Sequence, residues 1–121
     1  MNSTILVGKH AEHYATRFLI DQGLKLVERN WRCRYGEIDL IMLDRATLVF
    51  VEVRYRKSTT FAEPLESVNR AKQQRIIATA HAFLQKNSSW QEHDCRFDVV
   101  AAKSSNQTYS FDWVQHAFEA L

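Results

Sequence analysis

The order of apolar and polar residues over positions 36–56 predicts two β-strands joined by a short turn. A first apolar run extends from Ile38 to Met42, and a second, from Leu48 to Val53, is rich in β-branched and aromatic residues. Runs of roughly four to eight such residues are typical of strands. Because only a few polar residues separate the two runs, the pattern predicts a β-hairpin.

The turn of this hairpin decides which side chains face each other. If Arg45 and Ala46 form a two-residue loop, the numbers of paired residues sum to 91, and Asp39 lies opposite Glu52. Paired residues share a face of the sheet, with Cβ atoms roughly 5 Å apart, and Arg54 joins that face because strand side chains alternate. Arg-Ala lacks the Asn-Gly signal of a tight hairpin, however, and a slip by one residue would separate the two acids.

Helical spacing of apolar residues predicts two helices. The first covers residues 4–22, with Ser3 or Thr4 as N-cap and Gly23 as the stop, and the second extends from its N-cap Asn69 to about residue 86. Their inward stripes are expected to comprise Val7, Ala11, Tyr14, Ala15, Phe18 and Leu19 or Ile20 in the first helix, and Ile76, Ile77, Ala80, Phe83 and Leu84 in the second.

Three more strands complete the expected fold. Residues 24–29 form a short strand followed by a bend over 30–35, strands follow at 96–102 and 108–114, and a short helix begins at about Gln115. The order α-β-β-β-α-β-β predicts an α/β protein, in which a mixed sheet of about five strands is flanked by helices. On the fourth strand, Asp98 is expected to pair with Arg96 or with an arginine of a neighbouring strand, and not to take part in catalysis.

The composition fits one domain over residues 1–121 and excludes several classes of protein. With 45% apolar and 25% charged residues the chain is not disordered, and a net charge of +2 does not by itself indicate nucleic-acid binding. No signal peptide or apolar run of about 20 residues is present, so we expect a cytoplasmic protein without membrane contact. Cys33 and Cys95 provide no disulfide framework and are expected to be reduced thiols.

Positive charge is clustered along the chain. The clusters are Arg29, Arg32 and Arg34 before the hairpin, Arg54, Arg56 and Lys57 after it, and Arg70, Lys72 and Arg75 at the start of the second helix. Aromatic residues lie among the first two clusters, namely Trp31, Tyr35, Tyr55 and Phe61. This combination suits a phosphate backbone with stacked bases, although solvated arginines beside core aromatics fit the same pattern.

Two facing carboxylates on a largely apolar sheet require a counter-charge. At about 5 Å they repel by roughly 3 kcal/mol at an effective dielectric constant near 20. A divalent cation would supply the charge; alternatively, Asp39 or Glu52 pairs with Arg54 or another basic side chain, or points to solvent. Glu12 lies at the edge of the first helix's stripe, where periodicity favours a surface position beside Lys9 or Arg17 over one that reaches the site.

Several segments resemble a known family. They are residues 30–41 (NWRCRYGEIDLI), 50–56 (FVEVRYR) and 95–100 (CRFDVV), with Gly8, Glu12 and Ala15, the sequence KQQR at 72–75, and Ala117-Phe118. These segments closely resemble the YraN-like family of uncharacterised bacterial proteins, over nearly the whole chain. That family is similar to the restriction-endonuclease-like superfamily, near the archaeal Holliday-junction resolvases, so the resemblance implies a three-layer sandwich with a PD-(D/E)xK site.

The resemblance also implies roles for particular residues. Asp39 and Glu52 become metal-binding carboxylates, with the Val53 carbonyl as a third ligand, and Glu12 becomes the helix acid that reaches the metal, against the surface interpretation. Gln73 matches a helix Gln or Lys that faces the site in relatives. The expected ion is Mg²⁺ or Mn²⁺, since hard cations take carboxylate, carbonyl and water ligands.

The sequence departs from this family at Arg54, where a lysine is usual. Arginine can bind a phosphate through two hydrogen bonds, but its pKa above about 12 prevents it from deprotonating water. Because a metal ion lowers the pKa of bound water, hydrolysis with Arg54 as a phosphate clamp remains chemically possible.

The leading hypothesis is therefore a Mg²⁺- or Mn²⁺-dependent nuclease that acts on DNA more than on RNA, on branched or damaged structures, with Asp39, Glu52 and Arg54 as catalytic residues. A catalytically silent nucleic-acid-binding module on the same fold is the alternative, and a partner-binding protein without a nucleic-acid role is a third hypothesis. The resemblance to the resolvases, which work as dimers, implies a homodimer, but the sequence itself carries no interface signature. The nucleic-acid-binding residues would be Arg32, Arg34, Arg56, Lys57, Lys72, Gln73 and Arg75.

Overall fold

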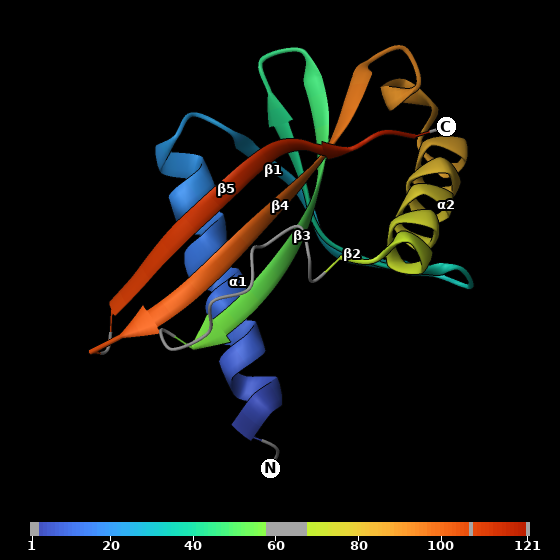
Figure 1. The fold of residues 1–121 in the computed structure, drawn as a ribbon. Coiled ribbons are helices and arrows are strands. Elements are labelled where there is room, and N and C mark those ends of the chain that lie inside the picture. Colours follow the sequence, from blue (N-terminus) through green and yellow to red (C-terminus); the bar gives the residue numbers. More distant parts are fainter. Residues whose placement is uncertain (1–2, 58–67, 107, 121) are drawn as a thin grey trace.

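A computed structural model describes residues 3–57, 68–106 and 108–120, and Phe61 lies outside this part. The described part contains one bent sheet with helices packed against it (Figure 1). In chain order the elements are α1 (Ser3–Asp21), β1 (Lys25–Cys33), β2 (Gly36–Asp44), β3 (Thr47–Lys57), α2 (Arg70–Lys86), the 3-10 helix η2 (Ser88–Trp90), β4 (Asp94–Ser105) and β5 (Thr108–Phe118).

The five strands lie side by side in chain order, β1-β2-β3-β4-β5. Strands β3 and β4 pair in parallel and are connected through α2, whereas every other neighbouring pair is antiparallel. A mixed five-stranded sheet with two α-helices confirms the predicted α/β class. The order of elements differs from the predicted one by η2, which lies between α2 and β4. No helix in the described ranges is long and apolar enough to cross a membrane.

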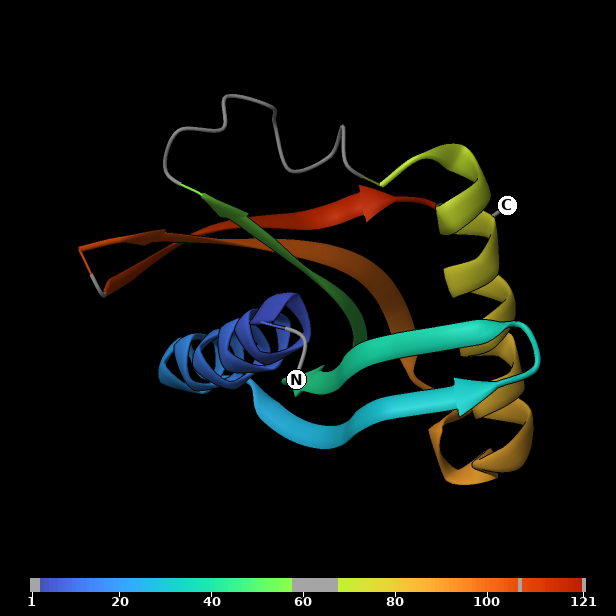
Figure 2. The same ribbon diagram turned by 90° about the horizontal axis from the view of Figure 1, so that it is seen from below.

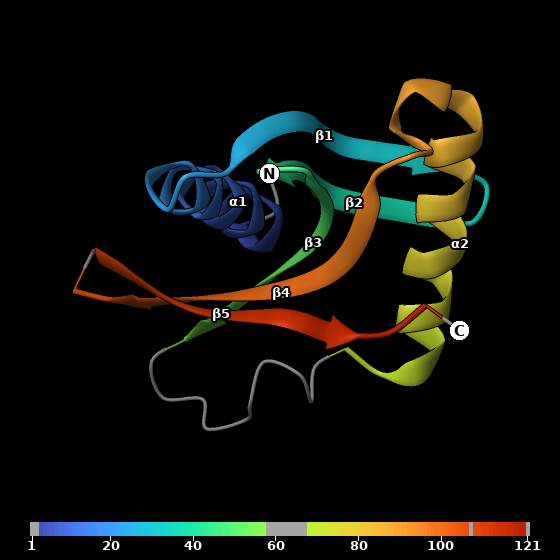
Figure 3. The same cartoon turned by 90° about the horizontal axis from the view of Figure 1, so that it is seen from above.

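The two helices cover opposite faces of the sheet, as Figures 2 and 3 show. Because strand side chains alternate between faces, β3 contributes Val49 to the core beneath α1 and Phe50 to the core beneath α2. In α1, Leu19 is buried and Ile20 is 42% exposed, which settles the alternative that the sequence left open. Tyr14 is also 42% exposed, so its predicted place in the inward stripe is wrong.

The hairpin has the predicted register. Leu40 pairs with Val51 and Asp44 with Thr47, so paired numbers sum to 91. Arg45 has φ 57°, a left-handed conformation that costs a residue other than glycine about 1–2 kcal/mol. Regular pairing between β2 and β3 ends at Leu40 and Val51, beyond which β3 turns away from β2 (Figures 2 and 3).

The predicted bend over residues 30–35 is wrong, because β1 continues to Cys33. Trp31 pairs with Ile38 and Cys33 with Gly36, so β1 and β2 form a second hairpin with only Arg34 and Tyr35 in its turn. The residues at the end of β1 instead alternate in exposure: Trp31 and Cys33 are half-buried, whereas Arg32 between them is exposed.

The predicted C-terminal helix is also wrong, because β5 continues to Phe118. Asp98, which is fully buried on β4, accepts hydrogen bonds from Arg96 Nε at 3.0 Å and from the His116 main-chain N–H at 3.1 Å. Phe118 then stacks on Phe97, with ring centroids 5.0 Å apart. These contacts hold the last residues against β4, and they confirm the expected pairing of Asp98 with Arg96.

Candidate metal centre

Acidic side chains from three elements gather at the point where β2 and β3 separate. Asp39 and Glu52 line a cavity of about 290 Å³ together with Glu37, and Lys72 and Arg75 of α2 lie on its other side. The hairpin register and the bend of β3 thus bring together the two acids that the sequence placed opposite each other.

Beyond Leu40 and Val51, where the regular pairing of β2 and β3 ends, the Asp39 side chain accepts a main-chain hydrogen bond from β3. Its Oδ2 accepts from the Val53 main-chain N–H at 2.8 Å. Burial and the negative charges of Glu52, Glu12 and Glu37 together raise the pKa of Asp39 to about 8, against the lowering effect of the Val53 hydrogen bond. Asp39 therefore keeps its proton at neutral pH when no added cation is present.

Within the described part of the chain, Glu52 contacts the cations Lys72 and Arg54. It is 5% exposed, and its Oε1 lies 3.3 Å from Lys72 Nζ and 3.5 Å from Arg54 Nη1. The contact with Arg54 matches one alternative raised by the sequence, but the shorter contact comes from α2. Lys72 thus brings an ammonium group into the acidic cavity.

Glu12 joins these acids from α1. With its amide nitrogen turned toward them, Asn30 donates to Glu12 Oε1 at 3.0 Å and to Glu37 Oε1 at 3.2 Å. Burial raises the pKa of Glu12, as do the charges of Glu37 and Glu52, while the Asn30 hydrogen bond lowers it. Glu12 is half-buried and faces the cluster rather than the surface cations that periodicity favoured.

Glu37 is the residue that the sequence reasoning missed. It lines the cavity beside Asp39, and its Oε2 pairs with Arg32 Nε at 2.7 Å. The signal was available, because Glu37 precedes Asp39 by two positions and strand side chains alternate with that period. The same ion pair fixes Arg32 at the edge of the cavity.

The side chains fit a hard cation that keeps several water ligands. Among residues 3–57, 68–106 and 108–120, no three His, Cys, Asp or Glu side chains form a ready metal-binding group. Asp39 and Glu52 provide two carboxylates. In a β-strand, the N–H and the carbonyl of one residue point toward the same neighbouring strand. Since the Val53 N–H donates to Asp39, the Val53 carbonyl lies on the side of Asp39 as well. Mg²⁺ is usually bound by one or two carboxylates and retains water, which matches this donor set.

The predicted nucleic-acid-binding residues separate into two groups. Arg32, Lys72 and Arg75 lie at the acidic cavity, and Arg34 lies exposed in the adjacent β1–β2 turn. Arg56, by contrast, is 7% exposed and lies inside the protein, and the side chain of Lys57 lies outside the described part.

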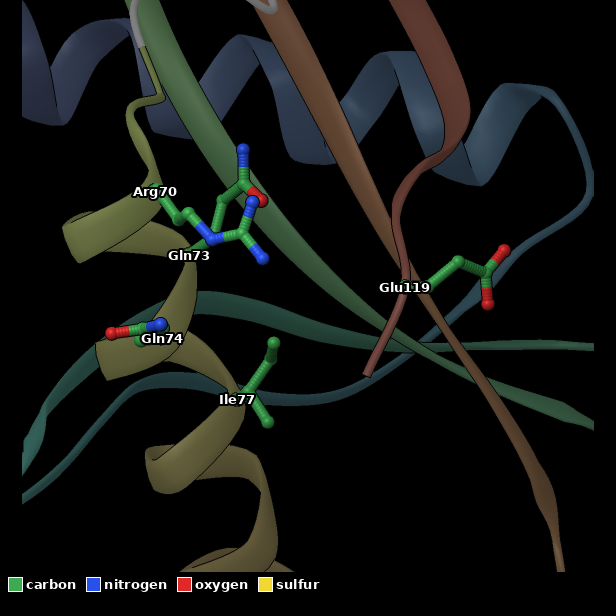
Figure 4. Close-up of a pocket in the computed structure, with 5 residues that line it drawn as sticks. All are labelled: Arg70, Gln73, Gln74, Ile77 and Glu119. Carbon is green, nitrogen blue, oxygen red and sulfur yellow. The ribbon is translucent and has the colours of Figure 1, made fainter. Parts of the chain in front are cut away.

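The match with relatives implied that Gln73 faces the acids, but in the structure it does not. Its amide donates to the Val68 carbonyl at 3.0 Å, and it lines a separate cavity of about 270 Å³ (Figure 4). Neighbouring helix residues point about 100° apart, so one position decides which cavity a side chain lines. Lys72 takes the place that Gln73 was expected to take.

Comparison with known proteins places the chain among close relatives. Residues 11–102 match the model of a family described as Uncharacterised protein family UPF0102. A UPF0102 protein of Stutzerimonas stutzeri is 51% identical over 113 residues, which cover 93% of this chain and 94% of the relative. A UPF0102 protein of Ectopseudomonas mendocina is 45% identical and covers 99% of this chain and 100% of the relative.

The raised pKa of Asp39 makes stability depend on pH. In the unfolded chain this carboxyl loses its proton near pH 4, but in the folded protein only near pH 8, so its contribution to stability falls as pH rises through that window. We expect Asp39→Asn to gain stability over the wild type by roughly 2–5 kcal/mol between pH 4 and pH 8, at about 1.4 kcal/mol per pKa unit.

Urea unfolding at the two pH values, without divalent cations, measures this difference. Asp112→Asn is the control, because Asp112 is an exposed residue of β5 whose ion pair with Lys103 should contribute less than about 1 kcal/mol. A stability difference between Asp39→Asn and the wild type that is the same at both pH values would contradict the burial and crowding of Asp39.

Proposed function

The chain belongs to the UPF0102 family, and we propose that it is a metal-dependent nuclease with a restriction-endonuclease-like fold that hydrolyses phosphodiester bonds in DNA. The observation that carries the proposal is the pair Asp39 and Glu52 in one cavity, with Lys72 and Arg75 facing them. The helices on both faces of a mixed sheet, and the β2–β3 hairpin that carries both acids, support the proposed fold.

In this proposal Asp39, Glu52 and the Val53 carbonyl hold Mg²⁺ or Mn²⁺, with Glu12 at the edge of the site. The ion, when bound, supplies positive charge to the scissile phosphate and lowers the pKa of water. Asp39 must lose its proton to become a ligand. Glu12 and Glu37 add negative charge to the cavity. This charge attracts a divalent cation, whose binding releases the proton of Asp39.

The cations around Glu52 are proposed to bind the substrate phosphate. Lys72 and Arg54 both contact Glu52 Oε1. When a metal ion and a phosphate enter together, the ion can replace these two cations on Glu52, and the cations can then bind the phosphate. Positive groups aimed at a developing phosphate charge lower the barrier to hydrolysis. Lys72 also supplies a lysine beside Glu52, which the motif residue Arg54 contacts as well.

A catalytically silent nucleic-acid-binding module is the second candidate. One observation favours it: Arg54 stands where the motif usually has a lysine, and arginine cannot deprotonate water. In that case the acids would hold a structural cation, and the basic residues would bind the phosphate backbone with a strong salt dependence.

Cleavage assays test the proposal directly. We expect Mn²⁺-dependent cleavage of at least one among single-stranded, duplex, flap and four-way DNA, and a loss of at least about 100-fold in Asp39→Asn, in the range typical of lost electrostatic stabilisation. Asp112→Asn should cleave like the wild type. Salt-dependent binding to DNA without cleavage of any substrate would favour the silent module.

Arg54→Lys separates two roles of the motif cation. Lysine keeps the charge but loses the two-pronged hydrogen bonding, and it gains an amine that can transfer a proton once its pKa falls. We expect faster Mn²⁺-dependent cleavage, by about the 100-fold low end of general-base effects, with little change in DNA binding. Single-turnover rates and binding by fluorescence anisotropy measure the two quantities.

The control for this change is Arg45→Lys in the exposed β2–β3 turn, which should alter neither rate nor binding. Slower cleavage together with weaker DNA binding in Arg54→Lys would show that Arg54 positions the phosphate and that proton transfer does not limit the rate.

A further inference from the structure

The β1–β2 turn places an exposed aromatic ring at the rim of the acidic cavity. Tyr35 is 44% exposed, whereas Gly36, the next residue, lines the cavity with Asp39 and Glu52. Figures 2 and 3 show this turn extending past the outer side of α2. An exposed tyrosine is therefore fixed at the edge of the proposed catalytic site, and the site's own ligands do not use it.

Close packing against α2 fixes the position of the turn. Gly36 has φ 151°, a conformation that other residues rarely adopt, and a Cβ atom there would lie 3.3 Å from Thr79 Oγ1 and 3.8 Å from Arg75 Cβ. The Tyr35 main-chain N–H also donates to Cys33 Sγ at 3.4 Å. The turn thus lies directly against the basic side of α2.

Arg34 orders the tyrosine ring and adds charge to it. Its Cζ lies 4.8 Å from the Tyr35 ring centroid, and its Nη2 donates to the Tyr35 hydroxyl at 2.6 Å. A guanidinium group over an aromatic ring is attracted by the ring's negative face. Arg34 thus brings a positive charge over the ring, and Tyr35 as a whole remains 44% exposed.

Resting on the proposed nuclease function, we propose that Tyr35 stacks on an unpaired DNA base about four nucleotides from the cleaved bond and so directs the enzyme to DNA with unpaired bases. Tyr35 is four residues from Asp39, or about 13 Å at roughly 3.3 Å per strand residue. That span corresponds to about four steps of a DNA strand at 3.4 Å each. Arg34 and Arg75 lie beside this path and match the charge of its phosphates.

The chemistry favours an unpaired base over a paired one. In a continuous duplex both faces of a base are covered by its neighbours, and separating them costs free energy before a protein ring can stack. A mismatched or single-stranded base offers its face at a lower cost, and every base has a face that an aromatic ring can cover. Tyr35 therefore discriminates by DNA structure and not by sequence.

Binding to two DNAs of equal length and charge tests this inference: a perfect duplex, and the same duplex with three consecutive mismatches that include 2-aminopurine. With Ca²⁺ in place of Mg²⁺, wild-type protein should bind the mismatched DNA more tightly and quench the 2-aminopurine fluorescence. Tyr35→Ala should weaken mismatched binding by about tenfold and abolish the quenching, while duplex binding and the salt dependence stay unchanged.

Two matched variants control for general damage. Tyr35→Phe keeps the ring and should retain the preference for mismatched DNA, and Tyr14→Ala removes a tyrosine of similar exposure, 42%, on α1 and should change nothing. Equal losses on both DNAs in Tyr35→Ala, no loss on either, or no DNA binding by the wild type would each overturn the inference.

Mn²⁺-dependent cleavage of the same two DNAs separates this inference from the function on which it rests. Binding that depends on Tyr35, without cleavage, would keep the stacking surface and contradict the nuclease. Cleavage without any preference that depends on Tyr35 would keep the nuclease and contradict the stacking surface.

Discussion

The hydrogen bond from the Val53 main-chain N–H to the Asp39 carboxylate determines the geometry of the candidate site. Regular pairing of β2 and β3 stops at Leu40 and Val51, and this side-chain bond of 2.8 Å replaces the next main-chain contact. Where two strands separate inside a sheet, main-chain N–H groups lose their hydrogen-bond partners. A carboxyl side chain is one group that can accept hydrogen bonds from them. The opening lets side chains from α1 and α2 approach the same point from opposite faces of the sheet.

The opening concentrates negative charge that the fold compensates only in part. Glu52 contacts Lys72 and Arg54, whereas Asp39 stays protonated at neutral pH because burial and its acidic neighbours raise its pKa. Grouped acids of this kind reduce the stability of the fold and are common where function requires them. A divalent cation would relieve the repulsion, and a phosphate would draw Lys72 and Arg54 from Glu52, so binding of the two would be mutually favourable.

Much of the fold could be predicted from the sequence, because the hairpin pattern and the two amphipathic helices depend on local spacing. The register that pairs Leu40 with Val51, and so brings the next residues Asp39 and Glu52 to one cavity, followed from turn length alone. The length of β1 and β5 did not follow, since it depends on pairing with a neighbouring strand and on the buried hydrogen bonds of Asp98. Lys72 faces the acids and Gln73 does not, because the rotation of α2 about its own axis decides which side chain points to the cavity. The position of a residue in a sequence motif does not specify this rotation.

The central claim is that Asp39 and Glu52 together bind a divalent cation. Anomalous scattering from crystals soaked in Mn²⁺ near pH 8 tests it most directly, because it locates the ion without relying on activity. The account predicts one Mn²⁺ in contact with oxygen atoms of both carboxylates, with Lys72 Nζ moved away from its position 3.3 Å from Glu52. Mn²⁺ bound elsewhere, with Lys72 still on Glu52, would contradict it.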